Sequence, residues 1–413
     1  MRQIASEANE STASSVEAAR DRPAPYGPDL DLKSYESDAS EQARSAGDSS
    51  LLPADRARLL EVGVDTGHGI PRSGSFLQVN HSLVHCASGQ EGLEILGIQE
   101  ARTRHEGLAD YWWQAVRPDA DKYTARTELQ GQGGYFVRAR PGARSIYPIQ
   151  AGLYLAEEGL AQAVHNVVVV EEGAALHLIT GCASAPNVRR GLHVGVSEFY
   201  VKRGARLTFT MVHGWAEEVA VRPRTGVVIE EDGMFLNNYI SLGPVQSVQM
   251  YPTAWLRGPR ALARFNSVLV ARPGAELDVG SRAILEAAGA RAELVARTIS
   301  MGGRIVSRGQ LVGRVPKVRG HLECRGLILS PGGSILAVPE LEGACPDLDL
   351  SHEAAVGRIN PEEIEYLMAR GLDEEEATAV IVRGFLNVDI AGLPDILERE
   401  MRAVLDLGAR RLL

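Results

Sequence analysis

The chain has 413 residues, of which 45% are hydrophobic and 23% charged, a composition typical of soluble proteins with a large core. A formal net charge of −10 argues against a general nucleic-acid binder, since such a protein needs a basic surface. Apolar runs such as Val167 to Val170 are far shorter than a membrane span, so we expect neither a nucleic-acid nor a membrane partner.

The first ten residues carry no apolar stretch behind Arg2, so we expect no secretory signal. The cysteines are widely scattered, and their spacing is not that of a disulfide framework. The four positions are Cys86, Cys182, Cys324 and Cys345. Reduced thiols and a cytoplasmic location are the expectation that follows.

Residues 1–50 are rich in Ser, Ala, Asp and Glu and hold few large apolar side chains. Such a segment cannot bury enough surface to offset the entropy lost on ordering, so we expect it to be mostly disordered. Residues 51–114 form a mixed N-terminal region. Within it, Pro53 to Leu60 favours a helix, and Trp112 and Trp113 are expected to anchor the region to a core.

A short phrase of a turn residue, a glycine and often an alanine recurs through the middle of the chain. Its instances are Pro141-Gly142-Ala143, Glu172-Gly173-Ala174, Arg203-Gly204-Ala205, Asp232-Gly233, Pro273-Gly274-Ala275 and Pro331-Gly332-Gly333. The first four glycines are spaced 31, 31 and 29 residues apart. Alternating runs such as Ala175 to Ile179 follow them, and this alternation predicts strands joined by tight glycine turns.

No helix-length periodic segment separates these strands, which disfavours a doubly wound α/β fold. A strand-and-turn unit that repeats at this interval favours stacked β-coils. We therefore predict a mainly β protein with a parallel β-helix core over residues 115–350. From the spacing alone, a β-sandwich remains the alternative.

Residues 351–413 have a helical pattern. Asn360 and Pro361 are an N-cap and a first helical residue, and Gly371 is a C-terminal cap. A second helix is predicted from Asp373 to Gly384, and a third begins near Pro394. These helices are either a cap on the β-domain or a docking surface for a partner.

Several enzyme motifs are absent from the sequence: a P-loop, a Rossmann fingerprint, C-x-x-C, H-E-x-x-H and G-x-S-x-G. What remains is a set of thiolates, imidazoles and carboxylates, the groups that hold zinc or iron–sulfur clusters. On residue type alone, each cysteine is more often a small buried core residue. The same holds for the lone histidines His165, His177 and His193.

Three stretches of the chain resemble the SufB/SufD family of iron–sulfur cluster assembly proteins, in the order in which that family has them. They are His165 to Cys182, Ser351 to Ile359, and Arg370 to Phe385. The resemblance covers roughly residues 110 to 410. Tyr147 to Ala151 is most similar to the short SufB-like proteins of archaea and minimal systems.

The resemblance implies a right-handed parallel β-helix and C-terminal helices that dock a SufC-like ABC ATPase. It also implies pairing with a second SufB/SufD-type chain, or with itself, through the β-helix. A transient cluster, expected to be 4Fe–4S, is then built from iron and from the sulfur of a cysteine desulfurase or its carrier. Whether a reduced flavin assists is left open. The chain is thus expected to be a scaffold rather than an enzyme, with ATP hydrolysis in the partner.

The resemblance also assigns roles to individual residues. Cys324, Glu353 and His352 match the cluster-assembly and metal-binding positions. Cys182 matches the position that receives sulfur first and passes it along the inside of the β-helix towards Cys324. A thiolate is the form that attacks a persulfide and binds iron, so the residue types suit these roles.

The sequence departs from the family pattern at two places. Ser351 stands where SufB proteins commonly have an acid, and His213-Gly214-Trp215 replaces Gln-Asn-Trp, which puts a glutamine-dependent sulfur path in doubt. Retention of Cys324 and Glu353 favours a SufB-like role; the alternative is a SufD-like partner that supports iron entry and complex stability. A polysaccharide-cleaving β-helix would need paired acids that the strands do not offer.

Overall fold

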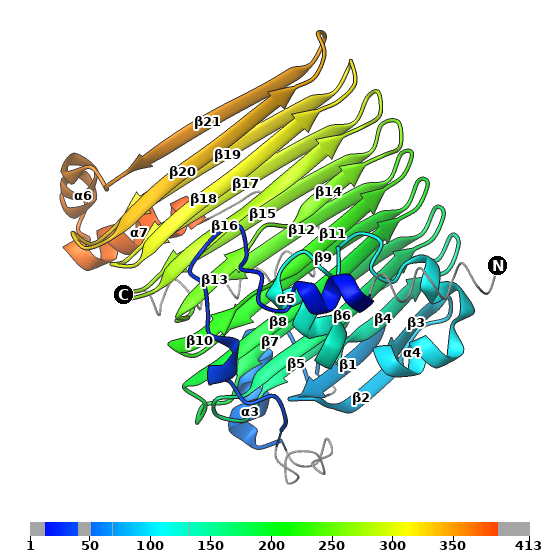
Figure 1. Cartoon of the computed structure of the whole chain (residues 1–413). Helices are drawn as coiled ribbons and strands as arrows, with labels where there is room; N and C mark the ends of the chain where they lie inside the picture. Colours follow the sequence, from blue (N-terminus) through cyan, green and yellow to red (C-terminus); the bar gives the residue numbers. More distant parts are fainter. Residues whose placement is uncertain (1–12, 40–50, 68, 132, 387–413) are drawn as a thin grey trace.

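The computed structural model describes residues 13–39, 51–67, 69–131 and 133–386. Most of the chain forms two long β-sheets that face each other across a common interior (Figure 1). The chain passes from one sheet to the other and back, so successive coils stack along one axis. About eight coils make up this parallel β-solenoid.

The first sheet has ten strands in the order β2–β1–β5–β7–β9–β12–β15–β17–β19–β21. Their bounds are β1 (Gly74–Val79), β2 (Ser82–Ser88), β5 (Ile149–Leu155), β7 (Ala175–Ser184), β9 (Arg206–Gly214), β12 (Met234–Ser241), β15 (Leu262–Ala271), β17 (Arg291–Ser300), β19 (Arg319–Ile328) and β21 (Asp349–Gly357).

The second sheet has eleven strands, with the path β10–β13–β16–β14–β11–β8–β6–β4–β3 and with β18 and β20 continuing beyond β16. Their bounds are β3 (Leu93–Gly97), β4 (Tyr135–Ala139), β6 (Ala161–Val170), β8 (Arg190–Val201), β10 (Glu218–Val221), β11 (Arg224–Ile229), β13 (Ser247–Met250), β14 (Thr253–Leu256), β16 (Glu276–Leu285), β18 (Arg304–Gly313) and β20 (Ser334–Gly343).

Helical elements lie before, between and after the strands. They are η1 (Leu32–Ser34), α3 (Pro53–Glu61), α4 (Ile98–Arg104), η3 (Glu106–Asp110), α5 (Lys122–Gln130), α6 (Pro361–Met368) and α7 (Glu374–Leu386). Within the described ranges, no helix is both long and apolar enough to cross a membrane.

The pairing between coils decides between the two predicted β-architectures. Among the described strands, pairings from coil to coil are parallel, and antiparallel pairing is confined to β1–β2 and β3–β4 at the N-terminal end. A β-sandwich is built from antiparallel sheets. The parallel β-helix predicted from the glycine repeat is therefore confirmed.

The recurring glycines occupy the turns where they were predicted. Gly142, Gly173, Gly204 and Gly274 all have positive φ, between +64° and +82°. This left-handed conformation favours glycine because it has no Cβ. In the Asp232-Gly233 repeat the left-handed residue is Asp232 itself, with φ of +54°.

Alternate residues of each strand fill the interior. There the Phe199 ring packs against Phe209 and Phe235, with centroids 4.6 and 5.4 Å apart. Phe235 in turn contacts the Phe265 ring of the next coil at 5.7 Å. All four are buried. Such aromatic contacts stabilise the core beyond the burial of their apolar area.

The solenoid is longer than the predicted core of residues 115–350. At its start, β1 already pairs in parallel with β5. At its end, β21 pairs in parallel with β19, so Ser351 to Glu353 lie on a strand rather than in the helical region. The reason is that Leu350 and His352 continue the inward-facing row of the preceding coil.

The first two predicted C-terminal helices are present. The Asn360 side chain accepts a hydrogen bond from Glu362 N at 3.1 Å and caps α6, and Gly371 beyond its end has φ of +101°. Helix α7 runs two residues past the predicted end, and its Val382 and Leu386 are buried. The third predicted helix lies outside the described residues.

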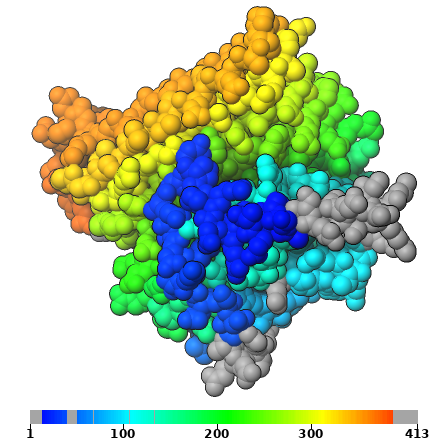
Figure 2. All heavy atoms as spheres, in the orientation of Figure 1, coloured from blue at the N-terminus to red at the C-terminus, as the bar shows by residue number. Residues whose placement is uncertain are grey.

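Residues 13–39, here called the N-terminal strap, lie along the outside of the second sheet (Figures 1 and 2). Lys122 Nζ forms an ion pair with Asp29 at 2.6 Å, and Gly27 N donates to Asp278 Oδ2 at 3.1 Å. Residues 1–50 were predicted to be mostly disordered, and for residues 13–39 this prediction is wrong. Composition missed this order because a few buried side chains, such as Val16, Ala19 and Tyr35, together with ion pairs and hydrogen bonds from distant parts of the chain, hold the strap in place.

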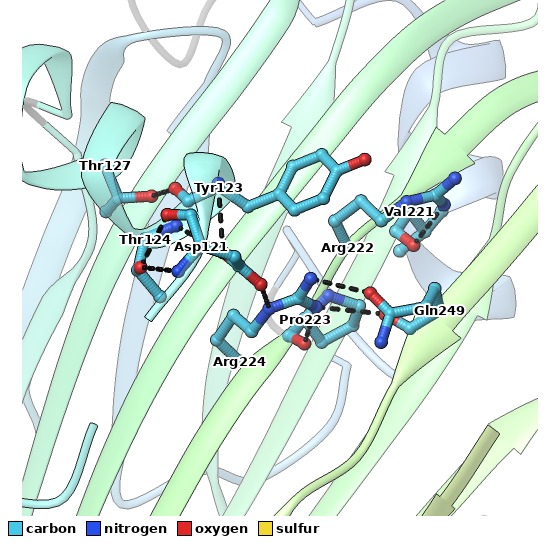
Figure 3. A network of polar contacts seen from close by, with 9 residues as sticks. All are labelled: Asp121, Tyr123, Thr124, Thr127, Val221, Arg222, Pro223, Arg224 and Gln249. Atoms are coloured by element: carbon cyan, nitrogen blue, oxygen red, sulfur yellow. Dashed lines mark hydrogen bonds and ion pairs between the residues drawn. The ribbon is translucent and has the colours of Figure 1, made fainter. Parts of the chain in front are cut away.

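Two arginines after β10, Arg222 and Arg224, bind α5 and the strap to the second sheet, and Figure 3 shows them beside Asp121 and Tyr123. Arg224 Nε contacts the buried carboxylate of Asp121 at 2.7 Å and lies over the Tyr123 ring at 4.9 Å. The fully buried Arg222 donates to Pro28 O at 3.2 Å. A buried ion pair of this kind tolerates little change, because removing one partner leaves the other charge unpaired.

The segment of α3 and the residues after it covers the outer face of the first sheet. It can do so because Gly181 on β7 leaves room for Val62 and Val64, whose atoms would lie 2.6–2.7 Å from an added Cβ. Tyr154 on β5 donates a hydrogen bond to Asp55 of α3 at 2.7 Å. This cover lies directly behind Cys182, the next residue of β7.

Gly181→Ala is expected to lower the free energy of unfolding by about 1–3 kcal/mol, because the added methyl group overpacks the contact with Val62 and Val64. Thermal unfolding followed by circular dichroism measures the change in Tm. Gly243→Ala is the matched control, since nothing lies within 4 Å of its added Cβ. Equal Tm values for the two variants would contradict the packing of α3 described here.

Candidate functional site

Cys324 lies in the middle of β19 with its side chain pointing into the solenoid, where it is 4% exposed. Ser307 on β18 of the opposite sheet donates a hydrogen bond from Oγ to the Cys324 sulfur at 3.9 Å. Burial raises the pKa of the Cys324 thiol; the Ser307 hydroxyl opposes this shift and the Glu323 carboxylate adds to it. The thiol is therefore held in its protonated, less reactive form.

A crevice beside Cys324 is lined by Ser281, Ala296 and Ser307, among others, and has a volume of about 10 Å³. That is about the room needed for one water molecule. A metal cluster does not fit there unless the surrounding coils move apart.

The other two predicted ligands lie on the neighbouring strand, β21. His352 is in register with Leu322, and Ala354 is in register with Cys324. Side chains alternate between the faces of a strand, so His352 points into the interior like Cys324, whereas Glu353 points outwards. The structure brings all three residues onto adjacent strands but places only Cys324 and His352 on the same face.

His352 Nε2 is buried and has no hydrogen-bond partner. A buried polar atom without a partner is unusual and points to a group that is satisfied in another state or by another molecule. Its position, on the last strand of the first sheet, makes it the inward-facing imidazole next to the end of the solenoid.

Glu353 belongs to a row of charges on the outer face. It accepts a hydrogen bond from Arg325 Nη2 at 3.2 Å, and Arg325 Nε also contacts Glu323 at 2.7 Å. Glu323 forms a further ion pair with Arg297. The Glu353 side chain is 56% exposed, so it is available to a partner that approaches this edge.

The predicted metal set is not assembled within a single chain. In the described ranges, no three His, Cys, Asp or Glu side chains converge as metal ligands would. Donors beyond Cys324 and His352 would have to come from movement of the chain or from a second chain.

The end of the solenoid next to Cys324 is uncovered by the described residues. Strands β20 and β21 are the last in their sheets and are mostly exposed. Leu336, Leu341 and Val356 on these strands are 42–55% exposed. Edge strands with exposed apolar side chains are templates for pairing with another chain.

Cys182, the predicted sulfur acceptor, is fully buried on β7 and also faces the interior. Its neighbour in register on β9 is His213, whose Nδ1 lies 2.9 Å from the Tyr239 hydroxyl. Burial raises the pKa of the Cys182 thiol. Polar side chains thus gather in the interior around Cys182 as they do around Cys324.

The structure keeps the two predicted sulfur-handling residues apart. Strands β9, β12, β15 and β17 lie between β7, which carries Cys182, and β19, which carries Cys324. At about 4.8 Å for each strand spacing, the separation along the stack is about 24 Å. Sulfur cannot pass directly from one thiol to the other.

The remaining cysteines lie outside this interior row. Cys86 on β2 contacts Ile95 O at 3.3 Å, and burial raises its pKa to about 11. Cys345 is half-buried in the turn between β20 and β21. All four thiols are free, as the scattered spacing predicted.

The sequence analysis did not predict three residues that lie near the predicted ones: Ser307, Arg325 and Tyr239. The sequence nevertheless contained a signal for which residues lie side by side on successive coils. Cys182 and His213 are 31 residues apart, the interval of the glycine repeat, and Glu323 and Glu353 are 30 apart. Residues separated by one repeat take equivalent places on successive coils.

A sequence profile of the SufBD core domain of the SUF system for Fe–S cluster assembly matches residues 153–385. This region starts within β5 and ends within α7. The chain belongs to the SufBD family. It therefore belongs to a family of iron–sulfur cluster assembly proteins, and the matched region contains Cys182, Cys324, His352 and Glu353.

Two archaeal SufBD family proteins are similar to nearly the whole chain. One from Methanothermobacter thermautotrophicus is 47% identical over 97% of this chain and 98% of its own length. One from Archaeoglobus fulgidus is 46% identical over 89% of this chain and 99% of its own. The iron–sulfur cluster assembly protein SufB of Bacillus subtilis is 29% identical over 74% of this SufBD chain and 67% of its own length.

Alkylation of the native SufBD chain at pH 7 is expected to modify Cys345 well before Cys324, because burial protects Cys324 and raises its pKa. A raised pKa means less thiolate at neutral pH, so labelling of Cys86 should increase with pH towards about 11. Mass spectrometry of digested protein locates the label. Rapid labelling of Cys324 at neutral pH in the isolated folded chain would contradict the buried position.

Proposed function

We propose that this SufBD protein is a SufB-like scaffold on which an iron–sulfur cluster is assembled as cargo. The observation that carries the proposal is the position of Cys324, one strand from the end of the solenoid that the described residues leave open. Ser307 and His352 lie beside it on the same interior, and the partnerless Nε2 of His352 offers a second donor. Thiolate and imidazole are both ligands of iron in such clusters.

The size of the crevice supports a scaffold with two states. The crevice beside Cys324, at about 10 Å³, is closed enough to shield the thiol. Cluster assembly needs space for several iron and sulfur atoms. Separation of β19 from the last coil would open the crevice towards Glu353 and His352. In this proposal the nucleotide cycle of a SufC-like ABC ATPase supplies the energy for the opening.

A second SufBD-type chain is proposed to cover the open end. No other described strand pairs with the outer edges of β20 and β21, so these edges supply backbone groups for strand pairing. Exposed Leu341 and Val356 supply apolar area. Glu353, on the outer face of the same edge, would then lie at the contact between the chains. The second chain is either another copy of this protein or a SufD-type relative.

The C-terminal helices are proposed to bind the ATPase. Ala377, Val382 and Leu386 bury one side of α7, while Val380 of α7 and Tyr366 of α6 are 45% and 57% exposed. A helix pair that is anchored on one side and apolar on the other is suited to docking a partner.

Cys324→Ala is expected to remove most of the 4Fe–4S absorbance that the complex with its ATPase acquires on anaerobic reconstitution, because the variant lacks the thiolate ligand. Iron, sulfide and subunit ratio are measured on the same sample. Cys345→Ala is the control and should retain the cluster. An unchanged spectrum in Cys324→Ala would remove this residue from the site and favour the SufD-like alternative, a partner that stabilises the complex.

Combined Tyr366→Ala and Val380→Ala substitutions are expected to weaken ATPase binding at least about tenfold, because both exposed side chains would be lost from the proposed contact. Titration calorimetry with the purified ATPase measures Kd. Leu129→Ala, which removes a 45% exposed leucine on α5, should bind like the unchanged chain. Equal affinity for all three proteins would place the ATPase elsewhere.

A further inference from the structure

The N-terminal strap reaches the outer side of the crevice that holds Cys324. The second-sheet wall of this crevice is formed by β16 and β18, which contribute Ser281 and Ser307 among others. Side chains alternate along a strand, so Ser307 points inwards to the Cys324 sulfur and the next residue, Arg308, points outwards. On this outer face the Arg308 guanidinium lies over the Tyr26 ring at 4.3 Å. Strand β18 thus contacts the cysteine on one face and the strap on the other.

Asp278 of β16 connects the strap to β18. Its carboxylate accepts two hydrogen bonds from Arg308, from Nε at 2.6 Å and from Nη2 at 2.9 Å. Gly27 N donates to Oδ2 of the same carboxylate at 3.1 Å. A bidentate arginine–carboxylate pair is directional as well as strong. Movement of β18 away from β16 must therefore break this pair or pull on the strap.

Tyr26 and Gly27, here called the tip of the strap, fit closely against the second sheet. The Tyr26 ring lies edge-on to Tyr251, the residue after β13, with ring centroids 5.4 Å apart. Gly27 has φ of +72°, and a Cβ added to it would lie 2.5 Å from Gln249 Cγ. A pocket of about 300 Å³ also borders Gly27. The tip is thus specifically seated, with open space beside it.

The rest of the strap is bound to other parts of the chain through its backbone. Basic side chains donate hydrogen bonds to four strap carbonyl oxygens at alternate positions. The pairs are Arg222 with Pro28, Lys122 with Leu30, Arg126 with Leu32 and Arg190 with Ser34. Glu36 forms a parallel bridge with Leu160, next to β6. On the second sheet, β11 and β14 lie between β8 and β16, so the tip contacts strands well away from these anchors.

We propose that the tip is a latch that keeps the Cys324 crevice closed. The proposal rests on the two-state scaffold of the proposed function and identifies an element that opposes its opening. With the tip seated, Ser307 and the rest of β18 are held against β16, and opening is confined to the coils beyond. Release of the tip lets β18 move with those coils, and the crevice widens from the second sheet. The backbone anchors of the strap stay in place.

The test compares Tyr26→Ala with Tyr35→Ala in the full chain. Each substitution removes a strap tyrosine that lies under an arginine, since Arg190 is 4.8 Å from the Tyr35 ring. The two rings differ in place: Tyr26 contacts β18, whereas Tyr35 contacts β8, at the anchored end of the strap. Gly27→Ala is a second test variant, because its added methyl group crowds the second sheet and displaces the tip without removing the ring.

The rate of iodoacetamide labelling is measured by mass spectrometry at Cys324, with Cys182 in the same sample as an internal reference. In Tyr26→Ala and Gly27→Ala, labelling of Cys324 is expected to be about two- to fivefold faster than in the unchanged chain, because loss of one contact makes local opening more frequent. Tyr35→Ala should label like the unchanged chain. Labelling of Cys182 should be equally slow in all of these proteins.

Three outcomes would overturn the latch. The first is an unaltered rate at Cys324 in both tip variants. The second is a rise at Cys182 that matches the rise at Cys324, since labelling would then report unfolding of the whole solenoid. The third is an equal, selective rise at Cys324 in Tyr35→Ala, which would show that the position of the ring does not matter.

A second measurement separates the latch from the proposed function. The unchanged chain and Tyr26→Ala are each reconstituted anaerobically with the ATPase, iron and sulfide, and cluster absorbance is followed in time. Faster cluster uptake by Tyr26→Ala supports both proposals. Selective labelling of Cys324 in Tyr26→Ala with no cluster in either protein supports the latch and overturns the scaffold. Cluster uptake by both proteins with equal labelling of Cys324 overturns the latch and leaves the scaffold intact.

Discussion

The parallel register between successive coils is the constraint on which the arrangement of the site depends. A strand that pairs in register with its neighbour cannot turn one side chain inwards without turning the next one outwards. This is why Cys324 and His352 share the interior while Glu353, adjacent to His352 in the chain, lies among arginines on the outer face. It also places Cys182 against His213, two residues that no local motif connects.

Much of the architecture could be predicted because it is encoded locally. Left-handed turns at Gly142, Gly173 and Gly204 set the repeat, and the caps at Asn360 and Gly371 set the bounds of α6. That Cys182 lies inside the β-helix followed from the family resemblance and not from any local pattern. The bounds of the solenoid could not be predicted, because Ser351 to Glu353 form a strand only by pairing with β19.

Other features depend on contacts that the sequence does not display. The strap was predicted to be disordered from its composition, yet Tyr35 is buried and the segment is held by Lys122 and Arg222 from more than 80 positions away. The roles of Ser307 and Arg325 likewise arise from facing or neighbouring strands. Spacing by one repeat was the only sequence signal for such neighbours, and it becomes usable once the coil is known.

The chemistry of the solenoid interior varies along the stack. Around Phe199 to Phe265 it is a tightly packed apolar core, whereas near Cys182 it holds imidazoles, a phenol and an indole, some with partnerless nitrogens. Partnerless buried nitrogens lower stability, and in a family that handles sulfur and iron they are consistent with a site retained for chemistry rather than for packing.

The strap contacts some coils of the solenoid and leaves the last ones free of it. In a repeat protein each coil normally touches only its neighbours, so a local distortion spreads easily to the next coil. Here one segment binds β6 through Glu36 and reaches β18, where Arg308 lies over the Tyr26 ring at 4.3 Å. It thus connects coils of the second sheet that are not neighbours, and we expect bending to be easiest in the coils beyond it. Those are the strands that hold Cys324 and His352.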